Sequence, residues 1–340
     1  MQAVRLHAFG EPPVVEEVPE PTASGPMDVV VRVGGAGLCR TDLHVLDGVF
    51  ADLCLPPPFV MGHETAGWVH QVGAGVEGFA VGDPVIVHPY LTCGVCPPCR
   101  RGDDQFCERF RFSGAMIDGG FADFIAISAR SLVKLNPTVA PAPVAGLADG
   151  GLAAYRAVKR SLDWLAPGSV AVVIGAGGLG HIAIQLVRAL SSASVIAVDR
   201  SVAALELAAE LGADVVIQAD GTHVQAVREA TAGRGADVVL DFVGDGGTPA
   251  EAIAMIARGG RYVVVGYGGR LEIPTYDLVG SEVTIDGSLV GSHADLVELA
   301  SLADDGRVTV TTQTYELGAI REAMDDLRAG RIRGRAVLVP

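Results

Sequence analysis

Four cysteines in the first half of the chain have the spacing of a metal site. They follow the pattern C-x2-C-x2-C-x7-C and are Cys93, Cys96, Cys99 and Cys107. Four thiolates complete the tetrahedral coordination of Zn²⁺ and leave no open position for a substrate. The spacing therefore predicts a structural zinc site that holds a loop without a hydrophobic core of its own.

Glycine and proline punctuate this cysteine segment, so we expect no regular helix or strand in it. The punctuating residues are Gly94, Pro97, Pro98 and Gly102. Two disulfides are the alternative to zinc, but they require an oxidising compartment. The N-terminus lacks the charged segment and apolar run of a secretory signal, which favours zinc.

Three further residues are candidate ligands of a second metal ion. Cys39, His63 and Asp149 lie far apart in the sequence, each in a polar or glycine-flanked setting. Thiolate, imidazole and carboxylate all bind zinc, and three ligands leave the open position that catalysis requires. Taken singly, they are more often a small buried thiol, a hydrogen-bonded histidine and a turn or helix cap. Their spacing alone does not show that they meet.

A glycine-rich turn indicates a nucleotide site. Between an apolar run and a helical pattern, the chain reads Gly175-Ala176-Gly177-Gly178-Leu179-Gly180, a G-x-G-x-x-G. Gly175 permits a tight turn, Gly177 lets the backbone approach a pyrophosphate, and Gly180 allows a helix to pack closely on a strand. The pyrophosphate is expected at the N-terminus of that helix.

The residue that ends the next predicted strand indicates which dinucleotide binds. Asp199 is placed to accept hydrogen bonds from an adenosine ribose and would repel a 2′-phosphate. This favours NAD over NADP. Arg200 follows directly and could stack on adenine or tolerate a phosphate, so the alternative stays open.

The elements that must position these residues fall into two patterns. Residues 1 to about 130 contain short valine-rich strands such as Asp28–Val33 and Val81–Val87. From about residue 169, apolar strands alternate with helical segments, as in βαβ units. We expect a six-stranded parallel sheet with strands Val170–Ile174, Val195–Val198, Val215–Ile217, Val238–Asp241, Arg261–Gly266 and Val283–Gly287. The predicted helices are Leu179–Leu190, Ala203–Leu211, Val224–Thr231 and Ala294–Leu302, before strands ending at Ala336–Val339 that should rejoin the first domain.

Length and composition limit the class of protein. With 340 residues, the chain exceeds the size at which single cores usually stop growing, so we expect two domains. The net charge of -15 argues against nucleic-acid binding, since no basic stripe is present to neutralise phosphates. No apolar run approaches the roughly 20 residues of a membrane helix. We expect a cytoplasmic protein that binds neither nucleic acid nor membranes.

Taken together, these segments resemble the zinc-dependent medium-chain alcohol dehydrogenase family over essentially the whole chain. The resemblance rests on Gly62-His63-Glu64 with Gly67, the run Cys39-Arg40-Thr41-Asp42-Leu43-His44, the four cysteines and the Gly175–Gly180 turn. It implies a catalytic zinc at Cys39, His63 and Asp149 and therefore two Zn²⁺ per chain. Horse-liver-like members have a second cysteine in place of Asp149, whereas many bacterial secondary-alcohol dehydrogenases have an aspartate. The chain length is similar to that of bacterial and archaeal members, which suggests a homotetramer.

The resemblance also implies an α/β domain organisation. A mostly-β, GroES-like catalytic domain is expected over residues 1–151, with the structural zinc lobe at about residues 90–110. An NAD-binding Rossmann domain is expected over residues 152–288. Residues 289–340 should return to the catalytic domain.

The implied reaction is reversible hydride transfer between an alcohol and NAD, giving a ketone or aldehyde. Zinc would stabilise the alkoxide as a Lewis acid, and NAD would accept the hydride. Thr41 and His44 could relay the released proton to water, which the resemblance also implies. The alternative is that these two residues cap a helix beginning near Asp42. Glu64 is either an orienting neighbour of the zinc site or an intermittent ligand.

Other candidate residues are placed by strand ends or by the resemblance. Ligands bind outside the carboxyl ends of parallel strands, so the cofactor cleft should be lined by Phe242, Val243, Val265 and Gly266. The resemblance implies that Ser288 and Val290 offer backbone groups to the carboxamide and that Arg333 reaches the pyrophosphate. Arginines clustered as at residues 331–335 more often mark a solvated edge.

The substrate is only weakly indicated. Four aromatic residues near the zinc segments are candidates for the substrate wall: Phe50, Tyr90, Phe110 and Phe112. They suggest a medium-sized hydrophobic alcohol, although aromatic residues there are as often core. Cys54 is expected to be an ordinary thiol. The alternatives are a polyol or sugar zinc dehydrogenase, a zinc-free quinone or enoyl reductase of the same superfamily, and an NAD-sensing or structural protein without activity.

Overall fold

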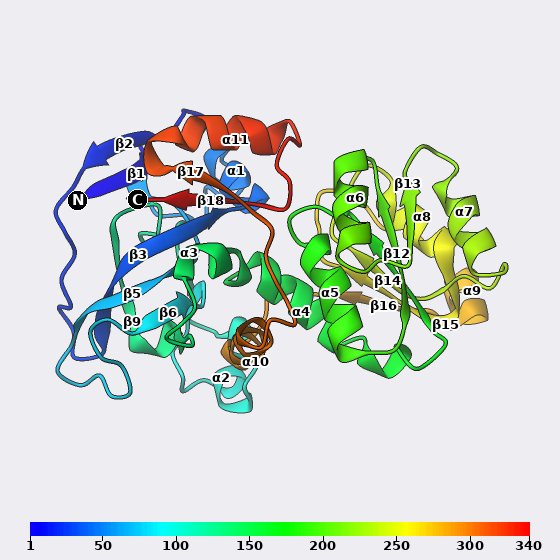
Figure 1. The fold of residues 1–340 in the computed structure, drawn as a ribbon, viewed down its shortest axis with the longest axis horizontal. Helices are drawn as coiled ribbons and strands as arrows, with labels where there is room; N and C mark the ends of the chain where they lie inside the picture. Colours follow the sequence, from blue (N-terminus) through cyan, green and yellow to red (C-terminus); the bar gives the residue numbers. More distant parts are fainter. The chain divides into compact units, whose positions relative to one another are not determined.

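The computed structural model describes all 340 residues, which fold into two compact units (Figure 1). The first unit comprises Met1–Leu152, Gly291–Gly306 and Val310–Pro340. The second comprises Ala153–Val290 and Arg307–Thr309. The chain therefore leaves the first unit twice, after Leu152 and after Gly306, and returns to it each time.

The first unit is built mainly from strands. Its largest sheet has the order β10-β6-β5-β3-β18-β17, with β9 also paired to β3, and smaller sheets have the orders β2-β1-β4 and β7-β8. Although they come from opposite ends of the chain, β18 pairs antiparallel with β3, as Figure 1 shows in red and blue. The strands are β1 (Gln2–Leu6), β2 (Val14–Glu17), β3 (Asp28–Leu38), β4 (Phe59–Val60), β5 (Glu64–Val72), β6 (Pro84–Val87), β7 (Tyr90–Leu91), β8 (Arg111–Phe112), β9 (Phe124–Ser128), β10 (Leu132–Lys134), β17 (Thr312–Glu316) and β18 (Arg335–Val339).

Short helices connect these strands. Apolar side chains from the inner faces of the sheets form one core, in which Phe59, Met61 and Phe121 are fully buried. The helices are α1 (Arg40–Leu46), α2 (Pro97–Arg101), α3 (Pro141–Val144), α10 (His293–Asp304) and α11 (Ile320–Arg328), with 3₁₀ turns at Asp104–Phe106, Ala129–Ser131, Ala145–Leu147 and Leu317–Ala319. The helix α4 (Gly150–Lys159) carries the chain from the first unit into the second.

The second unit confirms the predicted six-stranded parallel sheet. Its order is β13-β12-β11-β14-β15-β16, and every neighbouring pair is parallel. The strands are β11 (Val170–Ile174), β12 (Ser194–Asp199), β13 (Val215–Gln218), β14 (Ala236–Asp241), β15 (Ile256–Val264) and β16 (Thr284–Gly287). The helices are α5 (Gly180–Leu190), α6 (Val202–Glu210), α7 (His223–Ala230), α8 (Thr248–Met255) and α9 (Thr275–Ser281), with a 3₁₀ turn at Leu162–Trp164. This is the α/β fold class that the alternation of strand and helix patterns predicts.

The expectation of no helix in the cysteine segment is wrong. The helix α2 spans Pro97–Arg101 inside it. Its first two positions are prolines, whose fixed φ suits the first turn and whose missing N–H groups are not needed there. Gly102 ends it in the left-handed conformation, with φ of 85°. Five further helices are not among the predicted elements: α3, α4, α8, α9 and α11.

None of the helices is both long enough and apolar enough to cross a membrane.

Candidate functional site

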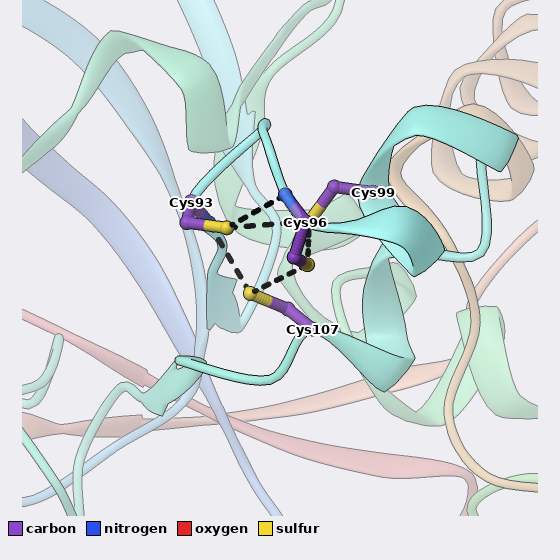
Figure 2. Close-up of side chains that lie close together, drawn as sticks. All are labelled: Cys93, Cys96, Cys99 and Cys107. Atoms are coloured by element: carbon purple, nitrogen blue, oxygen red, sulfur yellow. Dashed lines mark hydrogen bonds between the residues drawn. The ribbon is translucent and has the colours of Figure 1, made fainter.

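The four cysteines of the predicted structural site lie together in the lobe around α2 (Figure 2). The Sγ atoms of Cys96 and Cys99 are 3.4 Å apart, those of Cys96 and Cys107 3.9 Å, and those of Cys93 and Cys99 4.0 Å. Tetrahedral zinc with Zn–S bonds of about 2.3 Å requires sulfur separations of about 3.8 Å. All four cysteines are free of disulfides. The thiols therefore fit one four-coordinate zinc ion.

Backbone N–H groups in this lobe donate hydrogen bonds to the cysteine sulfur atoms, which favours their negatively charged form. Cys96 donates its N–H to Cys93 Sγ at 3.4 Å, and Arg109 donates to Cys107 Sγ at 3.4 Å. Hydrogen bonds from Val95 and Cys96 lower the pKa of Cys93 to about 5. Burial and the neighbouring sulfurs instead raise the pKa of Cys99 to about 12. A dication would favour the thiolate form of all four.

A second group of metal-binding side chains forms where three distant segments meet. Cys39 precedes α1, and Asp149 precedes α4. His63 directly precedes β5, whose first residue is Glu64. All four are buried, and their ligand atoms lie within 4.8 Å of one another. The structure thus brings the three predicted ligands together, with Glu64 beside them.

The geometry of this second group also fits zinc. The Nε2 atom of His63 is 3.4 Å from Asp149 Oδ2, which is 4.0 Å from Cys39 Sγ. Tetrahedral zinc places nitrogen and oxygen ligands about 3.4 Å apart. His63 Nε2 and Asp149 Oδ1 are buried and have no hydrogen-bond partner. Because buried polar atoms are rarely left unpaired, these two atoms favour a cation as their partner.

Electrostatics around His63 support the same conclusion. Burial alone would lower the pKa of His63, but the carboxylates of Asp42 and Asp149 raise it well above its usual value. The pKa of Asp149 is lowered, because its interactions with His63 outweigh the effect of burial. Zinc at His63 Nε2 would take the place of the proton that these carboxylates favour.

Asp42 orients two of the three candidate ligands. Its Oδ1 lies 3.2 Å from His63 Nδ1, and its Oδ2 accepts the backbone N–H of Cys39 at 2.8 Å. A carboxylate on the second nitrogen of a ligating histidine fixes the tautomer and the plane of the ring. The side chain of Asp42 therefore leaves Nε2 of His63 free for a metal.

Glu64 is held by Arg335, a residue that the sequence analysis missed. Arg335 Nε donates to Glu64 Oε2 at 2.8 Å, Arg335 NH2 donates to Oε1, and the Gly150 N–H donates to Oε1 at 2.7 Å. A Cβ at residue 37 would overlap Glu64 Oε2, so Gly37 provides the space for this carboxylate. Both oxygens of Glu64 accept hydrogen bonds here, and one of them lies within 4.8 Å of the ligand atoms of Cys39, His63 and Asp149.

The structure separates Arg335 from Arg333, to which the resemblance pointed. Arg335 is buried as the first residue of β18, whereas Arg333 lies exposed in the bend before that strand. The only sequence signal that distinguishes them is the start of the apolar strand after Gly334.

Thr41 and His44 lie inside α1, which begins at Arg40. The backbone cap is formed by Cys39 and Asp42, so neither Thr41 nor His44 caps the helix. The ring of His44 packs edge-on against Phe50, with centroids 6.1 Å apart. Burial and the charge of Arg40 lower the pKa of His44, against the opposing effect of Asp47.

Three of the four aromatic candidates form one cluster beside His63. The ring centroid of Phe112 is 5.0 Å from that of His63 and 5.2 Å from that of Tyr90. Phe110 packs on Tyr90 at 5.3 Å. Phe50 contacts His44. Cys54 lies half-buried in the loop between α1 and β4, and burial raises the pKa of its thiol.

The glycine-rich turn of the second unit has the shape that a pyrophosphate requires. Gly175 adopts φ of 85°, and a Cβ at residue 180 would overlap the carbonyl oxygen of Gly175. A Cβ at residue 177 would meet no atom within 4 Å, so the Gly177 backbone is open to a ligand. Gly178 and Leu179 complete the turn, and Leu179 is the N-cap of α5.

Asp199 holds this turn with its carboxylate. Its Oδ2 accepts the N–H of Ala176 at 2.7 Å, and its Oδ1 accepts the N–H of Ser201 at 2.8 Å. Arg200 is exposed, and its guanidinium lies near Gly246. Asp199 therefore stands at the end of β12 beside the turn, with the remaining lone pairs of each oxygen available to a ribose.

The other cofactor candidates lie at the carboxyl ends of their strands. Phe242 and Val243 follow β14, Val265 and Gly266 follow β15, and Ser288 follows β16. The hydroxyl of Ser288 is buried without a partner. Val290 has φ of 42°, which is strained for a β-branched residue and is typical of functional sites.

Two family models match the chain. An alcohol dehydrogenase GroES-like domain matches residues 25–137, and a zinc-binding dehydrogenase domain matches residues 178–305. These matches cover both groups of candidate ligands except Asp149. They also cover the second half of the glycine-rich turn and five of the six strands of the parallel sheet.

Individual relatives match over nearly the whole length. An NAD-dependent alcohol dehydrogenase of Sulfurisphaera tokodaii is 37% identical and is covered in full, as is this chain. A D-arabinose 1-dehydrogenase (NADP(+)) of Saccharolobus solfataricus is 34% identical, over 100% of this chain and 97% of the relative. The crystal structure of an alcohol dehydrogenase from the archaeon Aeropyrum pernix is 44% identical, with a TM-score of 0.96 and full coverage of both chains.

Proposed function

Because the chain belongs to the zinc-binding medium-chain alcohol dehydrogenase family, we propose that it is an NAD-dependent zinc alcohol dehydrogenase. The observation that carries the proposal is the buried group of Cys39, His63 and Asp149, with unpartnered His63 Nε2 and Asp149 Oδ1. A second, closed group of four thiols fits a structural ion. Two zinc ions per chain are therefore proposed, one at each group.

The catalytic role is assigned to the three-ligand group. Zinc held by Cys39, His63 and Asp149 would act as a Lewis acid that makes an alcohol hydroxyl more acidic. Asp42 fixes the orientation of the His63 ring. Glu64, paired with Arg335, fixes the position of the chain segment that carries His63. Thr41 and His44 are proposed to pass the released proton from the site toward water. The lowered pKa of His44 keeps it in the neutral form that accepts a proton.

NAD is the proposed hydride acceptor. The open Gly177 backbone suits a pyrophosphate, and the Asp199 carboxylate suits a ribose without a 2′-phosphate. Ser288 and Val290 are proposed to contact the carboxamide, and Arg333 the pyrophosphate. The first relative is named as NAD-dependent, which supports the same choice.

The proposed substrate is a medium-sized hydrophobic alcohol, or the corresponding ketone or aldehyde. Tyr90, Phe110 and Phe112 form an aromatic cluster against the His63 ring. A sugar is the second candidate, since the D-arabinose dehydrogenase is 34% identical. A zinc-free reductase is disfavoured, because such an enzyme would have no use for either group of ligands.

Three further proposals concern the domain bounds, the assembly and the cellular compartment. The catalytic domain is assigned to residues 1–151 and 289–340, and the nucleotide domain to residues 152–288. Copies of the chain are proposed to form a homotetramer. Because four thiolates must stay reduced to hold zinc, a cytoplasmic setting is proposed.

The proposed function is tested by measuring zinc per chain on untagged protein together with NADH formation. Primary, secondary and cyclic alcohols are compared with polyols and aldoses, each with NAD and NADP. The expected result is two zinc equivalents with turnover of hydrophobic alcohols and NAD. One equivalent without alcohol oxidation would contradict the proposal, and a preference for aldoses would favour the sugar dehydrogenase.

A matched pair of variants locates the catalytic ion. Asp149→Ala is expected to lose about one zinc equivalent and all turnover while the protein remains folded. The two ligands that remain, without the carboxylate charge, would bind zinc weakly. Cys54→Ser removes a thiol outside both groups and should retain two equivalents. Full activity and zinc content in Asp149→Ala would remove Asp149 from the site.

A further inference from the structure

Asp241 lies at the point of the parallel sheet where ligands bind in this kind of fold. The strands β12 and β14 flank β11 on opposite sides, so the strand order reverses between β11 and β14. The crevice outside the carboxyl ends of strands at such a reversal is the usual ligand site. Asp241 ends β14 and pairs with Ile174, the residue before Gly175. Its side chain was not among the predicted site residues.

The two carboxylate oxygens of Asp241 accept hydrogen bonds from different parts of the second unit. Its Oδ1 accepts the backbone N–H groups of Val243 and Gly244, each at 2.9 Å. Its Oδ2 accepts the hydroxyls of Tyr262 and Thr248, each at 2.9 Å. The side chain is fully buried, and all four donors are neutral. One oxygen therefore holds the turn after β14, and the other anchors the carboxylate in the core.

The backbone of Asp241 holds the adjacent turn as well. Its carbonyl oxygen accepts the N–H groups of Val265 and Gly266, at 2.9 and 3.0 Å. The two turns that should line the cofactor cleft are thus both tied to one residue. Burial and the Asp241 charge raise the pKa of Tyr262 far above its usual value, so this phenol remains a donor.

The turn that Asp241 holds fits tightly against the glycine-rich turn. A Cβ at Gly175 would lie 2.8 Å from Val243 Cγ2, which shows how closely Val243 covers the first glycine. A Cβ at Gly244 would overlap the carbonyl of Gly266. The three turns therefore interlock, and a shift of Val243 would alter the shape of the crevice above Gly175.

We propose that Asp241 is a positioning residue for the dinucleotide, which acts by fixing the Val243–Gly244 turn at the crevice beside Gly175. It contacts no ligand itself, because its oxygens are buried and fully used by the protein. The inference rests on the proposed NAD-dependent function and assigns a further determinant of cofactor affinity within it.

Because each oxygen of Asp241 has its own donors, variants can separate the positioning of the Val243–Gly244 turn from the stability of the fold. In Asp241→Ala, both carboxylate oxygens are removed, so the N–H groups of Val243 and Gly244 lose their acceptor and the Val243–Gly244 turn loses its anchor. The dissociation constant for NADH should rise about tenfold, which corresponds to roughly one lost buried hydrogen bond. Tyr262→Phe removes a donor from Oδ2 alone. It should lower the melting temperature but leave the dissociation constant within about twofold.

The experiment is a fluorescence titration of the full-length holoprotein with NADH, together with KM for NAD, kcat and the melting temperature. Asp241→Ala should raise KM for NAD with a smaller change in kcat at saturating NAD. Equal NADH affinity in Asp241→Ala and Tyr262→Phe would overturn the inference alone. Wild-type protein that binds no NADH would overturn the proposed function and this inference with it.

A second variant covers the case in which Asp241→Ala does not fold. Asp241→Glu keeps the charge but displaces the carboxylate by one methylene, so it should also weaken NADH binding. Wild-type affinity for NADH in a folded Asp241→Glu protein would contradict the positioning role.

Discussion

At the scale of single residues, the Glu64–Arg335 pair shows how the site depends on groups that are not ligands. Both side chains are buried, and burial raises the pKa of Glu64 while Arg335 opposes that rise. A bidentate pair in such a place is costly to break, because one charge is left in the interior without its partner.

Arg335→Met is therefore expected to destabilise the protein by about 3–5 kcal/mol. Urea denaturation measures the change. Arg333→Met is the matched control, since Arg333 is exposed and its loss should alter stability by less than about 0.5 kcal/mol. Equal destabilisation by the two variants would contradict the assignment of Arg335 to Glu64. The Arg333 variant should instead weaken NADH binding if that residue reaches the pyrophosphate.

His44 gives a prediction for the dependence of activity on pH. Burial, with Arg40, lowers its pKa, so the neutral imidazole persists to lower pH than in an ordinary histidine. In the proposed relay the neutral form of His44 accepts the proton, so kcat/KM for alcohol oxidation should fall only when the pH drops below the usual histidine value of about 6.5. His44→Gln should reduce kcat/KM and remove this acidic limb. An unchanged pH profile in the variant would exclude His44 from the relay.

At the scale of elements, strands and helices with a regular apolar pattern were predictable from the sequence, and elements without such a pattern were not. Each predicted strand of the parallel sheet is an apolar run, and the observed strands overlap all six. The helix α9 has only seven residues and none is buried, so no apolar periodicity marks it. Inside the cysteine segment, prolines start α2 although proline more often signals a break.

The same distinction applies to the candidate site. The four cysteines could be grouped from sequence because their ligand spacing is local. The meeting of Cys39, His63 and Asp149 depends on three elements coming together, so only a family resemblance suggested it. Arg335 was missed because its partner Glu64 lies far away in the chain. Asp241 was missed because only its burial and its packing against Tyr262 distinguish it from other charged residues at strand ends.

The cysteine lobe gives a prediction about an element. A helix as short as α2 is not stable by itself, so the lobe depends on the metal for its structure. Cys107→Ser should lose about one zinc equivalent and expose the α2 backbone at Arg100 and Arg101. Limited digestion with trypsin, which cleaves after arginine, should then cut there faster than in wild type. Cys54→Ser is the control, and unchanged cleavage in Cys107→Ser would show that the lobe folds without its metal.

At the scale of the whole molecule, the proposed tetramer needs a surface through which copies of the chain associate. Tyr276 and Val279 are 85% and 75% exposed, and they share one face of α9 at a spacing of three residues. Exposed apolar side chains that gather on one helix are typical of interaction surfaces. Burial of this face against a second copy would remove it from water.

Introducing charge on α9 should therefore break the assembly. Light scattering coupled to gel filtration is expected to show a tetramer for the wild type and a smaller species for Tyr276→Asp combined with Val279→Asp, because burying the new carboxylates is costly. Val81→Asp provides the control, since Val81 is 68% exposed in a loop of the first unit. A tetramer that survives the double substitution would place the interface elsewhere. A monomeric wild type would contradict the tetramer itself, and the exposed face of α9 would then remain in solvent in every copy.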